Sequence, residues 1–163
     1  MTEFQKYIQR YLDLIPTDHF FDELGQSEKA TLAIYLNLND ESALYKYAEN
    51  KWSLKEILQH LIDCERIFQY RALAISRGET QNLPGFDEEI YAKNSNADIR
   101  NVSDLIAEFS LVRQSSILLF KSFTAEMLLN KGFANGNEIS VETIEKLIVG
   151  HNLHHLNVIK ERY

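Results

Sequence analysis

Three of the five histidines lie close together near the end of the chain, at His151, His154 and His155. His151 and His155 are four residues apart, and on an α-helix this spacing places both side chains on one face, one turn apart. Two imidazoles in this arrangement can bind one metal ion, as the histidines of H-E-x-x-H zinc sites do. A stable site needs at least one further ligand from elsewhere in the chain.

His60 is the candidate for that further ligand. It lies in a predicted helix where the residues that share its face are core-like, so its side chain is expected to point inward. Three inward histidines leave the other positions on a metal to water or substrate, which is typical of a catalytic metal site. The alternative is that each is a buried histidine held by hydrogen bonds in the core. The sequence predicts a metal site of His60, His151 and His155.

Two neighbouring side chains have weaker claims to bind the metal. His154 is one step off the face that carries His151 and His155, which indicates a supporting or surface position. Cys64 follows His60 by one helical turn and could be a soft ligand, but a buried free cysteine behaves mostly as a small apolar residue.

Other polar residues near these histidines allow two interpretations each. Asp63 could hold an imidazole N–H of His60, or it could pair with Arg66. Arg71, on the inward stripe, could bind an anionic group of a substrate, although an ion pair between helices is the more ordinary role. Glu65 points well away from His60 around the helix and is expected to support the fold. No carboxylate is placed clearly enough to be named as a general base.

The elements that must position these residues are helices. Only two prolines and six glycines occur, and apolar residues recur with a helical period. Long amphipathic helices are expected at about 18–37, 53–77, 103–123 and 140–163, with a further helix over 4–15 and short ones near 87–92 and 124–129. A capping box is predicted at Ser53 and Glu56. The other expected N-caps are Thr17 or Asp18, Ser103 and Ser140. Residues 132–137 are expected to form a loop or a short extended pair. The prediction is an all-α four-helix bundle.

Composition excludes several function classes. The 163 residues are expected to form a single domain, and the net charge of −7 argues against nucleic-acid binding. The single cysteine, Cys64, cannot form an internal disulfide, and neither a signal-peptide segment nor a membrane-spanning run is apparent. A cytoplasmic location, without membrane or nucleic-acid partners, is therefore expected. A homodimer is compatible with the sequence, because two-fold pairs are the commonest soluble oligomers.

Three stretches of the sequence carry a resemblance to a known family. They are Lys51 to Arg66, with the pattern Trp-Ser-x-x-Glu-x-x-x-His-Leu, Leu83 to Glu88, and Gly150 to His155, with the pattern Gly-His-x-x-His-His. In order and spacing the chain resembles the DinB-like superfamily, which includes metal-dependent hydrolases of the YfiT type and bacterial low-molecular-weight-thiol S-transferases. The resemblance covers nearly the whole chain.

This resemblance implies an up-down-down-up bundle and a divalent metal, nickel or zinc, held by His60, His151 and His155. It implies a metal-dependent enzyme acting on a small molecule, either a hydrolase or a transferase whose substrate is a low-molecular-weight thiol. The alternative is a metal- or ligand-binding bundle of the stress response that has no catalytic activity, because a fold does not fix a function. An open pocket at the histidines would favour the enzyme, and a fourth protein ligand that closes the site would favour the alternative.

Overall fold

A computed structural model describes all residues 1–163, and most of them are helical. The α-helices are α1 (Glu3–Leu12), α2 (Phe20–Tyr35), α3 (Leu54–Ser76), α4 (Glu88–Asn94), α5 (Val102–Lys121), α6 (Ala125–Leu129) and α7 (Val141–Arg162). Two 3₁₀ turns, η1 (Ser42–Leu44) and η2 (Ala97–Ile99), and three short strands, β1 (Asn82–Leu83), β2 (Lys131–Ala134) and β3 (Asn137–Ser140), complete the chain.

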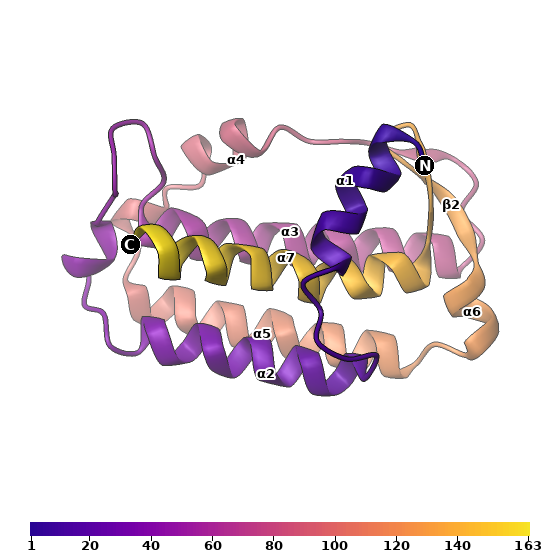
Figure 1. Cartoon of the computed structure of the whole chain (residues 1–163), viewed down its shortest axis with the longest axis horizontal. Helices are drawn as coiled ribbons and strands as arrows, with labels where there is room; N and C mark the ends of the chain where they lie inside the picture. Colours follow the sequence, from indigo (N-terminus) through magenta and orange to yellow (C-terminus); the bar gives the residue numbers. More distant parts are fainter.

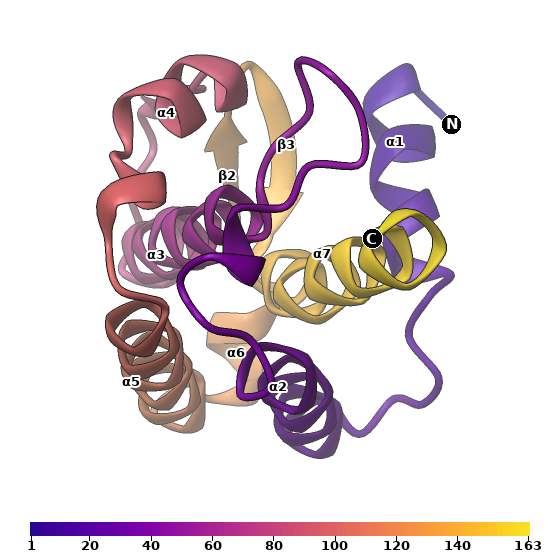
Figure 2. The ribbon, with the colours of Figure 1, turned by 90° about the vertical axis from the view of Figure 1, so that its left-hand side faces the viewer.

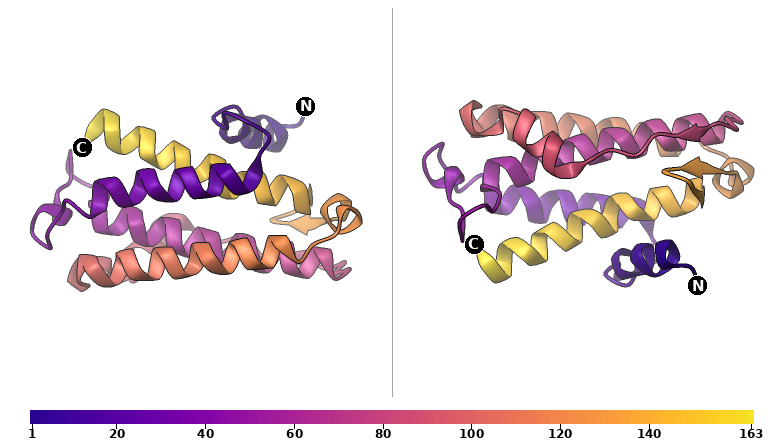
Figure 3. Two further views of the ribbon diagram at one scale, coloured as in Figure 1. Left: turned by 90° about the horizontal axis from the view of Figure 1, so that it is seen from below. Right: turned by 90° about the horizontal axis from the view of Figure 1, so that it is seen from above.

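Four of these helices form a bundle with the predicted up-down-down-up topology. Viewed along the bundle, α2, α3, α5 and α7 occupy the four corners, and α1 lies outside them against α7 (Figure 2). The helices α2 and α7 run in one direction and α3 and α5 in the other, because the segment that carries α4 returns along the bundle after α3 (Figures 1 and 3). The all-α four-helix-bundle prediction is confirmed, and α3 lies directly beside α7.

The helix starts show which predicted caps operate. Ser53 and Glu56 form the expected capping box at α3, and the Ser140 side chain accepts a hydrogen bond from the Thr143 N–H at α7. The predicted cap of α5 was wrong, since this helix begins at Val102 rather than after Ser103. A carboxylate from another segment explains the earlier start, because Asp40 Oδ1 accepts a hydrogen bond from the Val102 N–H at 2.7 Å.

The cap predicted for α2 was also wrong. The helix begins after His19, whose side chain makes no capping hydrogen bond. The Thr17 hydroxyl instead donates to Glu23 Oε1 at 2.7 Å and accepts from the His19 N–H, which leaves it outside the helix. The start of α2 therefore depends on the hydrogen bond between Thr17 and Glu23, which lie six residues apart.

A small sheet closes one end of the bundle. Strand β2 pairs antiparallel with β3 and parallel with β1, with Leu83 opposite Ala134. The β2–β3 turn consists of Asn135 and Gly136, which both have positive φ angles, 51° and 75°, as a tight hairpin turn requires. Of the two predicted alternatives for this region, the short extended pair is correct, and β1 was not predicted.

The core consists of two apolar clusters with buried polar residues between them. One cluster is centred on the ends of α3 and α7 near the sheet, with Ile75, Ile144 and Ile148, and the other lies near the opposite end, with Leu58, Leu105 and Phe109. Between them along the helices lies a group of buried polar residues, here called the polar layer, which consists of Ser27, Thr31, Glu65, Arg113, Ser116 and Asn152. None of the helices combines the length and the hydrophobicity that a membrane-spanning segment requires.

Candidate metal centre

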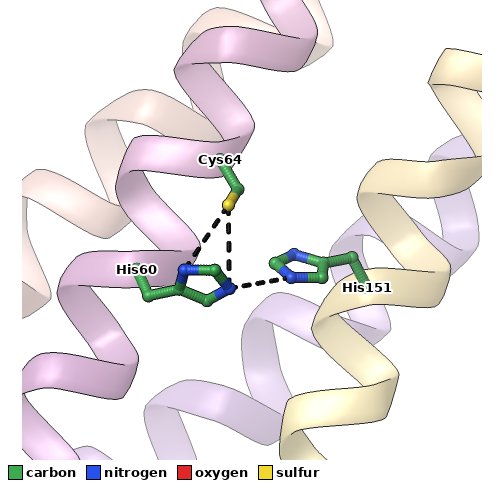
Figure 4. A group of neighbouring side chains, drawn as sticks. All are labelled: His60, Cys64 and His151. Carbon is green, nitrogen blue, oxygen red and sulfur yellow. Dashed lines mark hydrogen bonds between the residues drawn. The ribbon is translucent and has the colours of Figure 1, made fainter. Parts of the chain in front are cut away.

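The predicted histidines meet at the interface between α3 and α7, at the level of the polar layer. His60 lies on α3 and His151 and His155 lie on α7, one helical turn apart. His60 and His151 are buried, with only 4% and 8% of their surface exposed, and His155 is partly exposed. Figure 4 shows the rings of His60 and His151 pointing toward each other across the interface.

The ring nitrogens of the three histidines converge. The Nε2 atom of His151 lies 3.0 Å from that of His60 and 3.2 Å from that of His155. The three ring centroids are separated by 4.7 to 4.9 Å, so the rings form a nearly equilateral triangle. Nitrogen ligands of a tetrahedral zinc ion lie about 2.0–2.1 Å from the metal, which places them roughly 3.3 Å apart. The spacing of these nitrogens therefore suits a shared metal ion.

Burial keeps these imidazoles neutral. Desolvation, with a smaller contribution from the charges of neighbouring histidines, lowers the pKa of His60 to about 4 and that of His155 to about 2. Desolvation, followed by the charges of His155, His60 and His154, holds the pKa of His151 well below its usual value. Metal ligands must be unprotonated, and these side chains already are at neutral pH.

The donor set also fits a cation better than a hydrogen-bond network. Each neutral imidazole has one ring N–H and one lone pair, so a single His151 Nε2 cannot satisfy two neighbouring Nε2 atoms. A single lone pair or N–H in the plane of the His151 ring points at only one partner, so one of these two close contacts is poorly aligned for a hydrogen bond. A divalent cation between the rings would remove this conflict, because it accepts all three lone pairs.

Cys64 lies closer to this centre than its ordinary role as an apolar core residue suggested. Its Sγ atom is 3.6 Å from Nδ1 and 3.7 Å from Nε2 of His60 (Figure 4), and ligand atoms of His60, Cys64 and His151 all lie within 4.8 Å of one another. Burial raises the pKa of the Cys64 thiol, which disfavours the thiolate that a metal binds. Two ligand sets are therefore possible. Both contain His60 and His151, and the third ligand is either Cys64 or His155.

The other nearby candidates do not reach the centre. His154 is half-buried and packs edge-on against the rings of Tyr11 and His155, which agrees with the supporting position expected from its helix face. Asp63 contacts neither His60 nor Arg66 in the way that was expected. Its Oδ1 instead accepts a hydrogen bond from Gln59 Nε2 at 2.9 Å.

The polar layer holds the helices in register beside the histidines. Arg113 of α5 forms a bidentate ion pair with Glu65 of α3, with N–O distances of 2.9 and 3.0 Å. The same guanidinium donates to Asn152 Oδ1 of α7 at 3.1 Å and to the backbone carbonyl of Leu24 in α2 at 2.7 Å. One buried cation thus connects all four helices, and two of its partners directly adjoin Cys64 and His151 in sequence.

Only part of the polar layer was predicted from the sequence. Glu65 was expected to support the fold, but Arg113 and Asn152 were overlooked. A signal for Arg113 exists, because it follows Phe109 by four residues and precedes Ser116 by three, so it shares their helix face.

Comparison with known proteins agrees with this architecture. Residues 23–159 match the sequence model of the DinB superfamily, and this range contains every residue of the candidate centre. Over 127 residues the chain is 28% identical to a protein of Oceanobacillus iheyensis named "Putative metal-dependent hydrolase OB0413", a match that covers 76% of this chain and 72% of that protein. The chain belongs to the DinB superfamily.

A solved structure shares the fold. It is described in the words "YfiT from Bacillus subtilis is a probable metal-dependent hydrolase with an unusual four-helix bundle topology". The two structures superpose with a TM-score of 0.73 over 99% of this chain and 87% of that one, at 16% sequence identity. At this identity the similarity extends to the fold, while the chemistry of the site must be argued from its own residues.

Proposed function

We propose that this protein is a metal-dependent enzyme that acts on a small molecule, with a divalent nickel or zinc ion held by His60, His151 and His155. The enzyme is a hydrolase or a transferase that uses a low-molecular-weight thiol, and residues 1–163 form its single domain. The observation that carries the proposal is the convergence of three neutral imidazole nitrogens, with Nε2 separations of 3.0 and 3.2 Å around His151. The names of the similar proteins, which describe metal-dependent hydrolases, support it.

Access to the centre also supports an enzyme. His151 lines a cavity of about 150 Å³, and His155 lines a second hollow, of about 160 Å³, at the end of the bundle near Trp52 and Tyr163. A purely structural zinc site is enclosed by four protein ligands, whereas a catalytic site keeps a position open to water or substrate. The histidines therefore have space beside them for a small molecule.

The residues of the chain would divide the work as follows. A bound divalent metal supplies Lewis acidity, which lowers the pKa of a water molecule or a substrate thiol. His60 and His151 fix the position of that metal because they are buried on two adjoining helices held in register by the Arg113–Glu65 pair. The apolar cavity wall, which includes Phe68 and Ile144, limits the entry of bulk water and strengthens electrostatic interactions within the site.

A second function has one observation in its favour. If Cys64 bound the metal together with the three histidines, the site would have four protein ligands and no open position. Its Sγ–Nε2 distance of 3.7 Å to His60 suits such a site. The protein would then be a metal-binding bundle without catalytic activity, acting in the stress response as a sequestering or interaction protein.

Metal analysis of the untagged protein tests the proposed function. The wild type, purified and incubated with excess nickel or zinc, is expected to retain about one ion per chain by inductively coupled plasma mass spectrometry. The variant His155→Ala is expected to lose it, while the adjacent His154→Ala is expected to keep it as a matched control. A wild type that stays metal-free, or equal loss in both variants, would overturn the three-histidine centre. Hydrolysis of ester and amide substrates and conjugation of thiols to electrophiles would then separate the two reaction types.

A further inference from the structure

The cavity beside His151 is bounded by elements from distant parts of the chain. Its wall is formed by α1, α3, the turn after Pro84, the β2–β3 turn and α7. Both Cys64 and His151 line it, so a molecule in this cavity lies against the candidate metal centre. A volume of about 150 Å³ is comparable to that of an engineered protein cavity that binds benzene, which indicates room for one ring or a similar apolar group. Tyr7, Phe68 and Phe86 supply aromatic surface for such a group.

Arg71 places a positive charge in this mostly apolar wall. One terminal nitrogen of its guanidinium donates to the carbonyl oxygen of Pro84 at 2.9 Å, and the guanidinium carbon lies 5.9 Å from the centre of the Phe86 ring. Its Nε atom is buried and has no hydrogen-bond partner, the single buried side-chain nitrogen or oxygen in the protein with this property. Arg71 takes part in no ion pair, so it does not form the ion pair between helices that was expected as its more ordinary role.

Arg71 is only partly buried, but its buried Nε has no partner, and this is unfavourable unless something binds it. A buried donor without a partner carries a desolvation cost, and a cation carries more. Arg113, by contrast, is fully buried, but its charge is matched by Glu65 and its donors are used by three helices. The contrast indicates that Arg71 is held for a partner from outside the chain, and a guanidinium suits an anionic oxygen group.

We propose that the cavity binds a small molecule in which a carboxylate adjoins an apolar group of about one ring. Arg71 pairs with the carboxylate, the apolar group packs on the aromatic wall, and the reactive part faces His151. A monoanion fits better than a phosphate dianion, because Arg71 is the cavity's one arginine or lysine and the acidic residue Glu88 also lines it. The placement of the reactive part rests on the proposed metal function, but the pairing with Arg71 does not.

Binding of two matched probes tests this inference. The probes are 3-phenylpropanoate and its uncharged analogue 3-phenylpropanamide, titrated by isothermal calorimetry into the nickel- or zinc-treated protein. The wild type is expected to bind the acid about tenfold or more tightly than the amide, the preference expected for a hydrogen-bonded charge pair. Arg71→Gln should abolish this preference and Arg71→Lys should keep part of it. Arg77→Gln, an exposed arginine at the end of the same helix, should leave it unchanged.

A metal ion in the centre could itself bind a carboxylate, so the titrations are repeated on metal-stripped protein and on His155→Ala. Preference for the acid that persists in both, and disappears with Arg71→Gln, supports the inference. Preference that disappears when the metal is removed, or that survives Arg71→Gln, overturns it, and so does a wild type that binds neither probe or both equally. Metal content is measured separately on the same samples, so the preference for the acid can still be interpreted if the protein binds no metal. Circular dichroism of both Arg71 variants verifies that they are folded.

Discussion

His60 on α3 and His151 on α7 face each other with their Nε2 atoms 3.0 Å apart, at a point where the two helices run antiparallel. Each of these two residues also contacts a further possible ligand, Cys64 beside His60 and His155 beside His151. The pair is therefore common to every ligand set that the structure allows, and the chemistry of the centre depends on which neighbour joins it.

Alanine substitutions of His60, which belongs to every possible ligand set, and of Cys64 show whether the thiol is a further ligand. We expect His60→Ala to weaken zinc binding by roughly 100-fold or more, because the ~10–16 kcal/mol of a four-ligand zinc site corresponds to about 3 kcal/mol per ligand. We expect Cys64→Ala to change the affinity less than about threefold, since burial disfavours its thiolate. Competition with a chromophoric zinc chelator measures both affinities. A Cys64→Ala variant that loses as much affinity as His60→Ala would show that the thiol is a ligand.

Removal of one partner of the Arg113–Glu65 pair is expected to destabilise the protein strongly. Glu65→Ala leaves the fully buried Arg113 guanidinium without its carboxylate, and breaking one partner of a buried pair costs about 3–5 kcal/mol. The exposed Glu3–Lys6 pair serves as the control, and Glu3→Ala should cost at most about 1 kcal/mol. Urea denaturation measures both free energies of unfolding. Similar values for the two variants would contradict a structural role for the pair.

The sequence predicted the bundle and its histidines because both depend on local periodicity. The apolar stripe of α3 and the four-residue spacing of His151 and His155 fix which faces turn inward, and antiparallel packing of inward faces then brings His60 to them. The capping box at Ser53 was equally predictable from the sequence, because its two hydrogen bonds join residues only three positions apart.

Features that depend on contacts between distant segments were not predictable in the same way. The start of α5 is set by Asp40, which lies 62 residues before Val102. Strand β1 forms only because Asn82 and Leu83 meet β2 across the end of the bundle. The lack of an ion-pair partner for Arg71 likewise depends on the path of the segment after α3, which brings the Pro84 carbonyl to it instead of a carboxylate.

The stability of the metal-free protein is expected to decrease as the pH is lowered below about 6.5. The folded pKa of His60, about 4, lies below the unfolded value of 6.5, so the unfolded state binds more protons between these values. Stability from this residue is complete above pH 6.5 and is lost progressively toward pH 4, by about 3 kcal/mol for His60 alone. Urea denaturation in the presence of a chelator, at pH 7.5 and pH 4.5, measures the difference. His60→Gln should reduce the dependence, and the exposed His19→Gln should not. An equal dependence in all three proteins would contradict the burial of a neutral His60.

The docking of α1 on α7 is expected to depend on Gly150. A methyl group at this position would lie 2.4 Å from the carbonyl oxygen of Tyr11, a backbone atom that can move only if the end of α1 moves. We expect Gly150→Ala to cost about 1–3 kcal/mol of stability, as overpacking does, and to speed amide hydrogen exchange in residues 3–12.

Gly25→Ala is the matched control, because Gly25 also lies within a long helix but has no atom within 4 Å of the added methyl group. It should stabilise the protein by about 0.5–1 kcal/mol through helix propensity. If both variants were stabilised alike, α1 would not rest on Gly150. Because Tyr7, Ile8 and Tyr11 of α1 line the cavity beside His151, displacement of this helix should also weaken binding of 3-phenylpropanoate.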